Sequence, residues 1–544
     1  MGENANGFPS TLKAAVYAND PAPQFPEQSD DRFNPAKAGI GIALSGGGPR
    51  AFSCAHGQMA YYALNGGLDA VGAISCVSGG AWFGGLFSYA NASTSDSDLF
   101  GTVTVTAPGD ITLDMISADI DDQCLLSTIP GVSNEAIIGV FATLLVIHKL
   151  DPKDLPWDRF YNRLVDTFFC GPFGLNSLDT TYTIDGVIGA AGTSLGDIST
   201  YKLRQGRPFY IANATQLWPT GANEVMRRFE FSSLYSGMPQ AFPGAGNGGQ
   251  DLGYGYVENF AFNSAAPAAP PSAGIVTVDT PTLVPLLSDA MGSSSAAFAS
   301  ILAKLSPEIS ESINPEYSYW PMTSIGTEAA QTYQIGDGGN LENTGIAGLL
   351  MRGYQLIIAF VNSEYPLGST DGGCVNGVAG QISRLFGYIP ESHFGNSQDT
   401  QIFAGAEFGS KLVPGLEAAK QAGGIVYTMG NYTIIDDNAF GIDPALYPDG
   451  AFVCWVYNDI ISSWVNDLPT DVSDLLSSTD KTNYFANFPN FATVGQNKTK
   501  HGIPELIYYT PEQTNLLANM WFNALNSDEE FQNGIAAKRA ELGI

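Results

Sequence analysis

Two buried strand-like runs, each followed by a glycine turn and a helix, stand close together near the start of this 544-residue chain. Residues 39–44 alternate small and aliphatic side chains, and a turn then leads into a predicted helix over 50–64. Residues 71–77 repeat the pattern, and the next helix, over 79–89, is entered directly from Ser78. Because strands and helices alternate in proteins with a parallel sheet, the pattern predicts an α/β fold.

The alternation stops for a long stretch and then resumes. Later strands are predicted over 332–335, 356–361, 424–429 and 452–457, and later helices over 343–352 and 511–525. Residues 92–330 interrupt the alternation and are interpreted as a cap-like insertion. The expected organisation is an extended arm over 1–38 and one catalytic domain over 39–544, a three-layer α/β/α fold around a mixed, largely parallel sheet.

Charge limits the partners that this chain can bind. Its formal net charge is −31, with 23 Lys plus Arg, so nucleic acid is not an expected partner. An anionic membrane would also be repelled, whereas zwitterionic or neutral membranes and micelles remain possible transient partners. The longest apolar run, over 137–147, is shorter than the roughly 20 residues that span a bilayer. It is predicted to be a buried core helix, with a lipid-facing helix as the alternative.

The six cysteines are too scattered for a disulfide scaffold. One or two bridges remain open among Cys124, Cys170, Cys374 and Cys454. No CxxC pair is present, and the acidic residues over 119–122 lack the spacing of a calcium loop, so neither a metal site nor a cofactor is expected. The start of the chain does not read as a signal peptide, which favours the cytoplasm, whereas the acidity favours an extracytoplasmic or luminal setting. Of the two, an extracytoplasmic or luminal setting is favoured, with the cytoplasm as the alternative.

Three short segments carry groups suited to acyl transfer. SGGGPR, ending at Arg50, offers consecutive backbone N–H groups that could hold an oxyanion. CVSGG places Ser78 on a tight turn after an apolar run, and IGDGGNLEN places Asp337 just past another strand-like run. A nucleophile, a base and an oxyanion hole are the parts that ester hydrolysis needs. The candidate oxyanion-hole residues are Gly46, Gly47 and Gly48.

Ser78 has the surroundings of a nucleophile elbow. Gly79 and Gly80 permit a strained backbone and a close approach, and the helix that starts there would direct its positive end at the serine oxygen. The usual elbow has glycine two residues before the serine, where this chain has Cys76. An ordinary turn serine is the alternative.

The base is predicted to be a carboxylate. None of the four histidines has the local signature of a catalytic triad, so a Ser–Asp dyad of Ser78 and Asp337 is favoured, with an aspartate in a plain glycine turn as the alternative. Arg50, near the start of its helix, could bind a substrate phosphate or carboxylate, or could form a structural ion pair.

These segments resemble a known family. SGGGPRA, SCVSGGAWFGGL and IGDGGNLENTGIAGLLMRGYQLIIAFVNS look like the catalytic domain shared by the cytosolic phospholipase A family and the fungal lysophospholipases (phospholipase B). RFEFSSLYSGM, over 228–238, is similar to a further stretch of that family, although Ser233 stands where the family has proline. The resemblance covers roughly residues 38–365, and patatin-like lipases share the implied core.

The resemblance implies a carboxylic ester hydrolase of the phospholipase A or lysophospholipase type, without a cofactor. Ser78 would accept the acyl group, Asp337 would be its base, and Arg50 would neutralise a phosphate or stabilise the site. The implied substrate is a phospholipid, a lysophospholipid or another glycerolipid. Two alternatives stay open: transfer of the acyl group to another alcohol or amine, and a catalytically idle storage or carrier protein built on this fold.

Overall fold

The computed structural model describes residues 10–17, 25–150, 155–185, 198–218, 225–240, 254–272, 274–281, 284–302, 313–320, 330–393, 398–476 and 484–544. The chain divides into two compact units. The parallel-sheet unit contains Asp31–Phe83, Ala92–Gly139 and Glu342–Ile544. The antiparallel-sheet unit contains Met1–Asp30, Gly84–Asn91 and Val140–Leu341.

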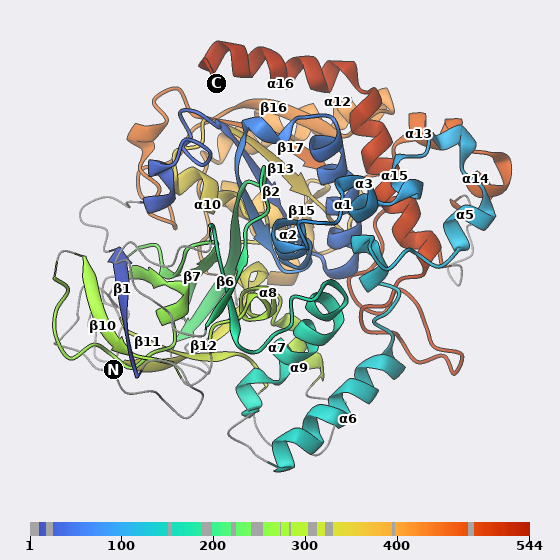
Figure 1. Cartoon of the computed structure of the whole chain (residues 1–544). Coiled ribbons are helices and arrows are strands. Elements are labelled where there is room, and N and C mark those ends of the chain that lie inside the picture. Colours follow the sequence, from blue (N-terminus) through green and yellow to red (C-terminus); the bar gives the residue numbers. More distant parts are fainter. Residues whose placement is uncertain are drawn as a thin grey trace. The chain divides into compact units, whose positions relative to one another are not determined.

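Five strands form the main sheet of the parallel-sheet unit, within its described residues. Side by side, they are β3 (Val71–Val77), β2 (Ile40–Leu44), β13 (Leu356–Val361), β17 (Ala451–Tyr457) and β16 (Tyr427–Tyr432). The first four run parallel, and β16 is antiparallel to β17. All residues of β2, β3 and β13 are buried, as expected for parallel strands covered on both faces. The fold is α/β with a mixed, largely parallel sheet, as the sequence predicts (Figure 1).

Helices cover both faces of this sheet. The ring of Phe360 in β13 lies 6.5 Å from that of Tyr62 in α1 (Gly48–Leu64) and 6.2 Å from that of Trp521 in α15 (Pro511–Ser527). On the opposite face, Gly41 of β2 lies against Leu349 of α10 (Ile346–Met351), where an added Cβ would be 3.0 Å from the leucine side chain. Helix, sheet and helix therefore form three layers in this unit (Figure 1).

The predicted elements of this unit agree with the structure to within about three residues. The helix predicted over 50–64 begins earlier, at Gly48, because Pro49 fits the first turn of a helix. The helix predicted over 79–89 is α2 (Gly79–Tyr89). Shorter or peripheral helices of the unit are α3 (Asp96–Phe100), α4 (Thr102–Val105), α5 (Leu113–Ser117), α11 (Gly380–Ser383), α12 (Val413–Ala422), α13 (Ser462–Asp467), α14 (Thr470–Leu476) and α16 (Glu529–Leu542).

The antiparallel-sheet unit is built differently. Its main strands, in order across the sheet, are β10 (Ile275–Asp279), β1 (Thr11–Tyr17), β9 (Gly255–Glu258), β8 (Tyr235–Met238), β7 (Val225–Ser232), β6 (Phe209–Trp218), β12 (Gln331–Asp337) and β11 (Glu316–Tyr319). Each of these strands is antiparallel to its neighbour in that order. Most come from residues 92–330, which the sequence suggests form a cap. The assignment of that stretch as an insertion into one domain stays a prediction.

Two helices of this unit, α7 (Phe160–Val165) and α8 (Leu287–Ser294), are joined by a buried ion pair. Arg159, just before α7, lies 2.8 Å from Asp289 of α8, and Nδ2 of Asn162 donates to the same carboxylate at 2.8 Å. In turn, α8 contacts β6 and β12. The network therefore fixes the helices against the strands that lead to Asp337.

Three features of the sequence have a clear outcome in the structure. All six cysteines are free, so none of the disulfides left open above is formed. The apolar run 137–147 lies in α6 (Asn134–Leu150), and the prediction of a buried core helix holds for only one face of it. Among the described residues, no helix is both long enough and apolar enough to span a membrane.

Candidate active site

Ser78 lies where β3 ends and α2 begins. Its φ is +51°, in the left-handed region that residues with a Cβ rarely adopt. Its carbonyl oxygen accepts hydrogen bonds from the N–H groups of Ala81 at 2.8 Å and Trp82 at 3.1 Å, so the strained residue is tied into the first turn of the helix. The side chain is buried, with 6% of the residue exposed. This strand–turn–helix geometry is that of a nucleophile elbow.

The glycine loop after β2 lies directly against this elbow. A Cβ on Gly79 would come within 2.0 Å of the carbonyl oxygen of Gly48, and one on Gly80 within 2.5 Å of that of Leu44. A Cβ on Gly46 would lie 3.0 Å from Cβ of Ser78. The contact follows from the topology, because β2 and β3 are parallel neighbours and their carboxyl ends share one edge of the sheet.

The three glycines of the loop differ in what their N–H groups do. The N–H of Gly46 donates to the carbonyl oxygen of Asn343 at 3.0 Å. In the described part of the chain, the N–H groups of Gly47 and Gly48 have no acceptor. Gly47 has φ +141° and Gly48 has φ +55°, and Gly48 is the first residue of α1, where backbone donors are unsatisfied by the helix itself. Two donors at a helix N-terminus suit an anion.

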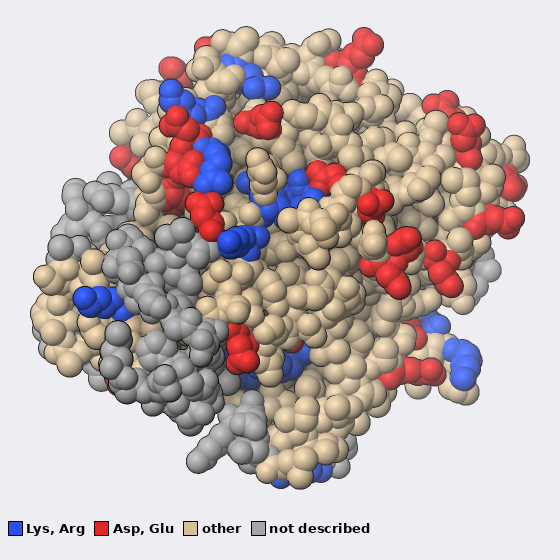
Figure 2. Space-filling model, in the orientation of Figure 1, with Lys and Arg blue, Asp and Glu red and all other residues tan. Residues whose placement is uncertain are grey.

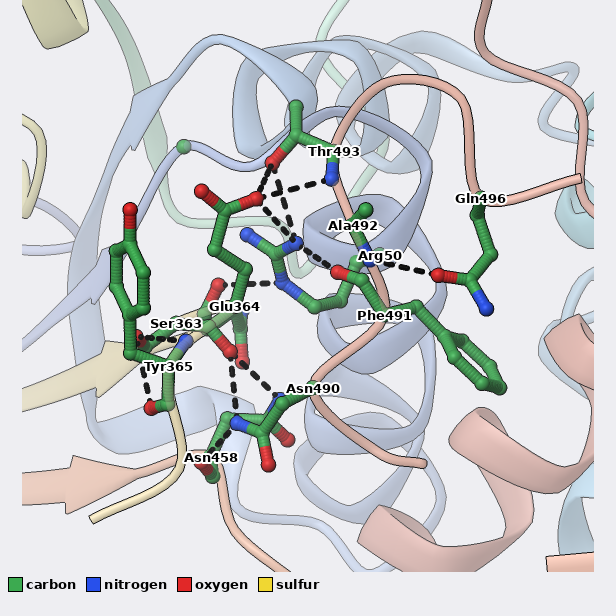
Figure 3. Close-up of polar contacts among 12 residues, drawn as sticks. Arg50, Ser363, Glu364, Tyr365, Asn458, Asn490, Phe491, Ala492, Thr493 and Gln496 are labelled. Carbon is green, nitrogen blue, oxygen red and sulfur yellow. Dashed lines mark hydrogen bonds and ion pairs between the residues drawn. The ribbon is translucent and has the colours of Figure 1, made fainter. Parts of the chain in front are cut away.

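Arg50 is held by four groups of the protein (Figure 3). Its Nε donates to the carbonyl oxygen of Asn362 at 2.9 Å. Its Nη1 donates to the carbonyl oxygen of Phe491 and, at 3.1 Å, to Oγ1 of Thr493, and it lies 3.7 Å from Oε2 of Glu364. The guanidinium is buried, and a Cβ on Gly47 would lie 2.5 Å from its Nη2.

The residues around Arg50 are fixed in their turn. The side chain of Asn490 donates to the carbonyl oxygens of Ser363 at 2.9 Å and Asn458 at 2.8 Å. Both N–H and Oγ1 of Thr493 donate to Glu364 at 3.1 Å. Arg50 thus joins the glycine loop to two segments, 362–364 and 490–493, and the geometry is that of the structural ion pair named as an alternative for this residue.

Asp337 belongs to the antiparallel-sheet unit, at the end of β12. It pairs with Ala214 of β6, and its Oδ1 accepts a hydrogen bond from the N–H of Gly339 at 2.7 Å. The side chain is buried. The carboxylate is therefore placed by a strand end and by the tight turn that follows, as the glycines after it suggest.

Tyr161 supports the same region. Its hydroxyl donates to the carbonyl oxygen of Ser295, just after α8, at 2.8 Å. Burial is the main reason that the pKa of Tyr161 lies above its usual value, its hydrogen bond with the side chain of Ser295 lowers the pKa, and the charge of Asp337 raises it. Tyr161 therefore stays protonated, and α8 also contacts the turn 338–340 that follows Asp337.

Two of the histidines are held by hydrogen bonds to backbone carbonyl oxygens. His56 is buried, and its Nε2 donates to the carbonyl oxygen of Phe100 at 2.9 Å. Burial lowers its pKa to about 4, so its imidazole is neutral. His148 bonds to the carbonyl oxygen of Leu155, and His501 is exposed. Among the residues that the structure describes, no group of three or more His, Cys, Asp or Glu side chains could hold a metal ion.

The parallel-sheet unit brings together most of the residues predicted from sequence: Gly46, Gly47, Gly48, Arg50, Ser78, Gly79 and Gly80. Asp337 is in the other unit. Sequence reasoning missed Asn343, Asn362 and Glu364. A signal existed for Asn362 and Glu364, because both follow β13, whose carboxyl end lies at the same sheet edge as Ser78. The segment 490–493 carries no such signal.

Comparisons with known proteins support the fold. No protein-family model matches the chain, and no curated protein matches it by sequence. A structure of human GIVD cytosolic phospholipase A2 is similar over 95% of this chain and 66% of its own, with a TM-score of 0.50 and 10% identity. The same human protein in complex with methyl gamma-linolenyl fluorophosphonate and terbium chloride aligns over 99% of this chain and 66% of its own, with a TM-score of 0.45 and 12% identity. The chain thus has a phospholipase-like fold and spans 66% of the length of that neighbour.

Proposed function

We propose that the protein is a serine lipid acyl hydrolase of the phospholipase A or lysophospholipase type. The observation that carries the proposal is the left-handed backbone of Ser78 at a strand–helix elbow, packed against a loop in which two N–H groups have no acceptor among the described residues. Backbone strain persists where the surrounding structure holds it, and it clusters at active sites. The phospholipase-like fold of the neighbour supports the same reaction class.

In the proposed reaction, Oγ of Ser78 attacks the ester carbonyl carbon while Asp337 accepts the hydroxyl proton. The N–H groups of Gly47 and Gly48 stabilise the negative oxygen of the tetrahedral intermediate. The intermediate collapses, the alcohol leaves with the proton from Asp337, and an acyl-serine remains. Water then attacks the acyl-serine, giving its proton to Asp337, and Ser78 recovers a proton when the fatty acid departs.

Gly46 and Arg50 take positioning roles in this proposal. The N–H of Gly46 donates to the carbonyl oxygen of Asn343 and holds the loop in place, so it is not available to bind an oxyanion. Arg50 orients the loop through its bonds to Asn362 and Phe491 and lies against Gly47. A substrate phosphate would have to compete with these acceptors and with Glu364 for the guanidinium, so we assign Arg50 to stabilisation of the site.

The decisive experiment is active-site labelling of the whole chain with an alkyl fluorophosphonate, followed by peptide mapping. We expect one adduct on Ser78, none in Ser78→Ala, and a strongly reduced rate of labelling in Asp337→Asn. Ser53→Ala, which changes a buried serine of α1, is the matched control and should label as the wild type does. An adduct on a different serine, or an unchanged rate in Asp337→Asn, would overturn the assignment.

The substrate class is tested separately by incubating the wild type with phosphatidylcholine and lysophosphatidylcholine. We expect free fatty acid and the corresponding alcohol product, lost in Ser78→Ala. Labelling at Ser78 without release from either lipid would leave the nucleophile standing and refute the phospholipid class.

A further inference from the structure

Helix α6 has two apolar faces, of which only one is packed. Ile137, Phe141 and Leu144 are buried. The ring of Phe141 lies 5.6 Å from that of Phe160, and the ring of His148 lies 4.3 Å from that of Trp157. These side chains follow each other at intervals of three or four residues and anchor one side of the helix.

Both ends of α6 are held by hydrogen bonds. Near its start, the N–H of Asn134 donates to Glu505 at 2.7 Å, and its side-chain oxygen accepts from the N–H of Leu506 at 2.9 Å. Near its end, Nδ1 of His148 is bonded to the carbonyl oxygen of Leu155 at 2.8 Å. Residues at both ends of the helix are therefore hydrogen-bonded, and the exposure of the other face does not come from frayed ends.

The other face, here called the outer face, is defined by Ile138, Val146, Ile147 and Leu150. Their exposed fractions are 57%, 56%, 42% and 81%. Gly139, Ala142 and Thr143, also exposed, lie between them and add no charge. The four residues expose on the order of 400 Å², which is the size of the largest apolar patch on a typical soluble monomer, and such a patch often has a function.

The outer face is also electrically neutral. Its charged residues are Glu135 and Lys149, which are opposite in sign, in a chain whose net charge is −31. In Figure 2, the surface at the place where Figure 1 draws α6 is mostly tan. The helix therefore offers apolar contact without the acidic surface that would hold a negatively charged partner away.

We infer that the outer face of α6 docks the protein on the surface of electrically neutral lipid, such as a zwitterionic bilayer. The inference rests on the proposed lipid hydrolase and names the surface through which it would reach its substrate. A fixed helix with one packed face and one exposed apolar face can lie in the plane of a lipid interface and bury its outer side chains there. Few basic residues are available to bind anionic lipid, whereas apolar burial needs none.

A second copy of the chain fits the outer face less well. A stable protein interface buries about 800 Å² on each partner, roughly twice the area that the four side chains expose. The single charges at the two ends of the helix also offer little to fix one copy against another.

The experiment is flotation of the full-length protein with phosphatidylcholine vesicles. It is done in the Ser78→Ala background, so that hydrolysis does not change the vesicles. We expect Val146→Glu/Leu150→Glu to lower the partition coefficient about tenfold or more, because two charges must enter an apolar interface. The matched control, Leu178→Glu/Leu446→Glu, replaces two exposed leucines elsewhere with glutamate and should bind within about twofold of its parent.

A second measurement uses the two double variants with an active Ser78. Val146→Glu/Leu150→Glu should keep the wild-type rate on a soluble short-chain ester and should need about tenfold more vesicle lipid for half-maximal hydrolysis. Unchanged flotation of this variant would overturn the inference. So would light scattering that shows a dimer in the wild type and a monomer in the variant, because a second copy would then cover α6. Flotation without any ester hydrolysis by the wild type would instead refute the proposed function and leave the docking surface standing.

Discussion

The strain at Ser78 predicts an unusual order of stability among substitutions. With φ at +51°, a residue with a Cβ costs about 1 kcal/mol more here than glycine does. Ser78→Gly and Ser78→Ala both remove the hydroxyl, so the loss of the hydrogen-bonding group is common to them. The free energy of unfolding of Ser78→Gly should therefore exceed that of Ser78→Ala by about 1 kcal/mol.

Ser53 provides the matched control, because it is also buried but lies in the interior of α1. There glycine costs about 1 kcal/mol relative to alanine, so Ser53→Gly should be less stable than Ser53→Ala. The order reverses between the two sites, and the two differences together amount to about 2 kcal/mol. Both pairs lose a hydroxyl, and at Ser53 that hydroxyl donates to the carbonyl oxygen of Pro49 at 2.9 Å.

The assay is thermal unfolding followed by calorimetry, with denaturant titration as a second measure. For a cooperative unit of a few hundred residues, 1 kcal/mol shifts the midpoint by about 2 °C. Ser78→Gly should melt above Ser78→Ala by about that amount, with neither variant showing esterase activity. If Ser78→Ala melts at or above Ser78→Gly while the Ser53 pair behaves as expected, the elbow is not strained and the argument for Ser78 loses its main support.

Two further predictions follow from buried charged and titratable groups. Arg50→Lys should lower the free energy of unfolding by about 3 kcal/mol, because one ammonium cannot replace the Nε and Nη1 donors; a wild-type melting temperature in this variant would contradict the anchoring role. His56 has its pKa lowered to about 4, so its neutral form stabilises the fold above pH 6.5, and up to about 3 kcal/mol is lost as the pH falls from 6.5 to 4. Between pH 6.5 and 4, the free energy of unfolding should change less with pH in His56→Gln than in the wild type. An equal pH dependence in the two proteins would show that His56 is not the group responsible.

The sequence predicts the parallel-sheet unit well, for a physical reason. Parallel strands covered on both faces need continuous apolar runs, and β3 and β13 are such runs. The close approach of the elbow to the loop also leaves a mark in the sequence, because two backbones in contact leave no room for side chains and require glycine. The glycines beside Ser78 therefore indicate both the elbow and its contact with the loop.

In the antiparallel-sheet unit, the strand predicted over 332–335 corresponds to β12, but most of the other strands could not be predicted in the same way. Strand β7 buries Arg228 and Glu230, which form an ion pair, and the hydroxyl of Tyr256 donates to Glu230 at 2.8 Å. Charged residues in mid-strand hide the alternation on which strand prediction depends. Strand β1, in the arm over 1–38, could not be predicted either, because its partners β9 and β10 lie more than 200 residues later in the sequence.

The hydrogen bond between Arg50 and Phe491 sets an order of events during synthesis. Its two residues are 441 positions apart. At 5–20 residues per second, a ribosome needs roughly 20 to 90 s to make the intervening chain. For nearly all of that interval, Ser78 and the glycine loop exist without the segment that anchors Arg50. The candidate site thus reaches its final form only when nearly the whole polypeptide has been made.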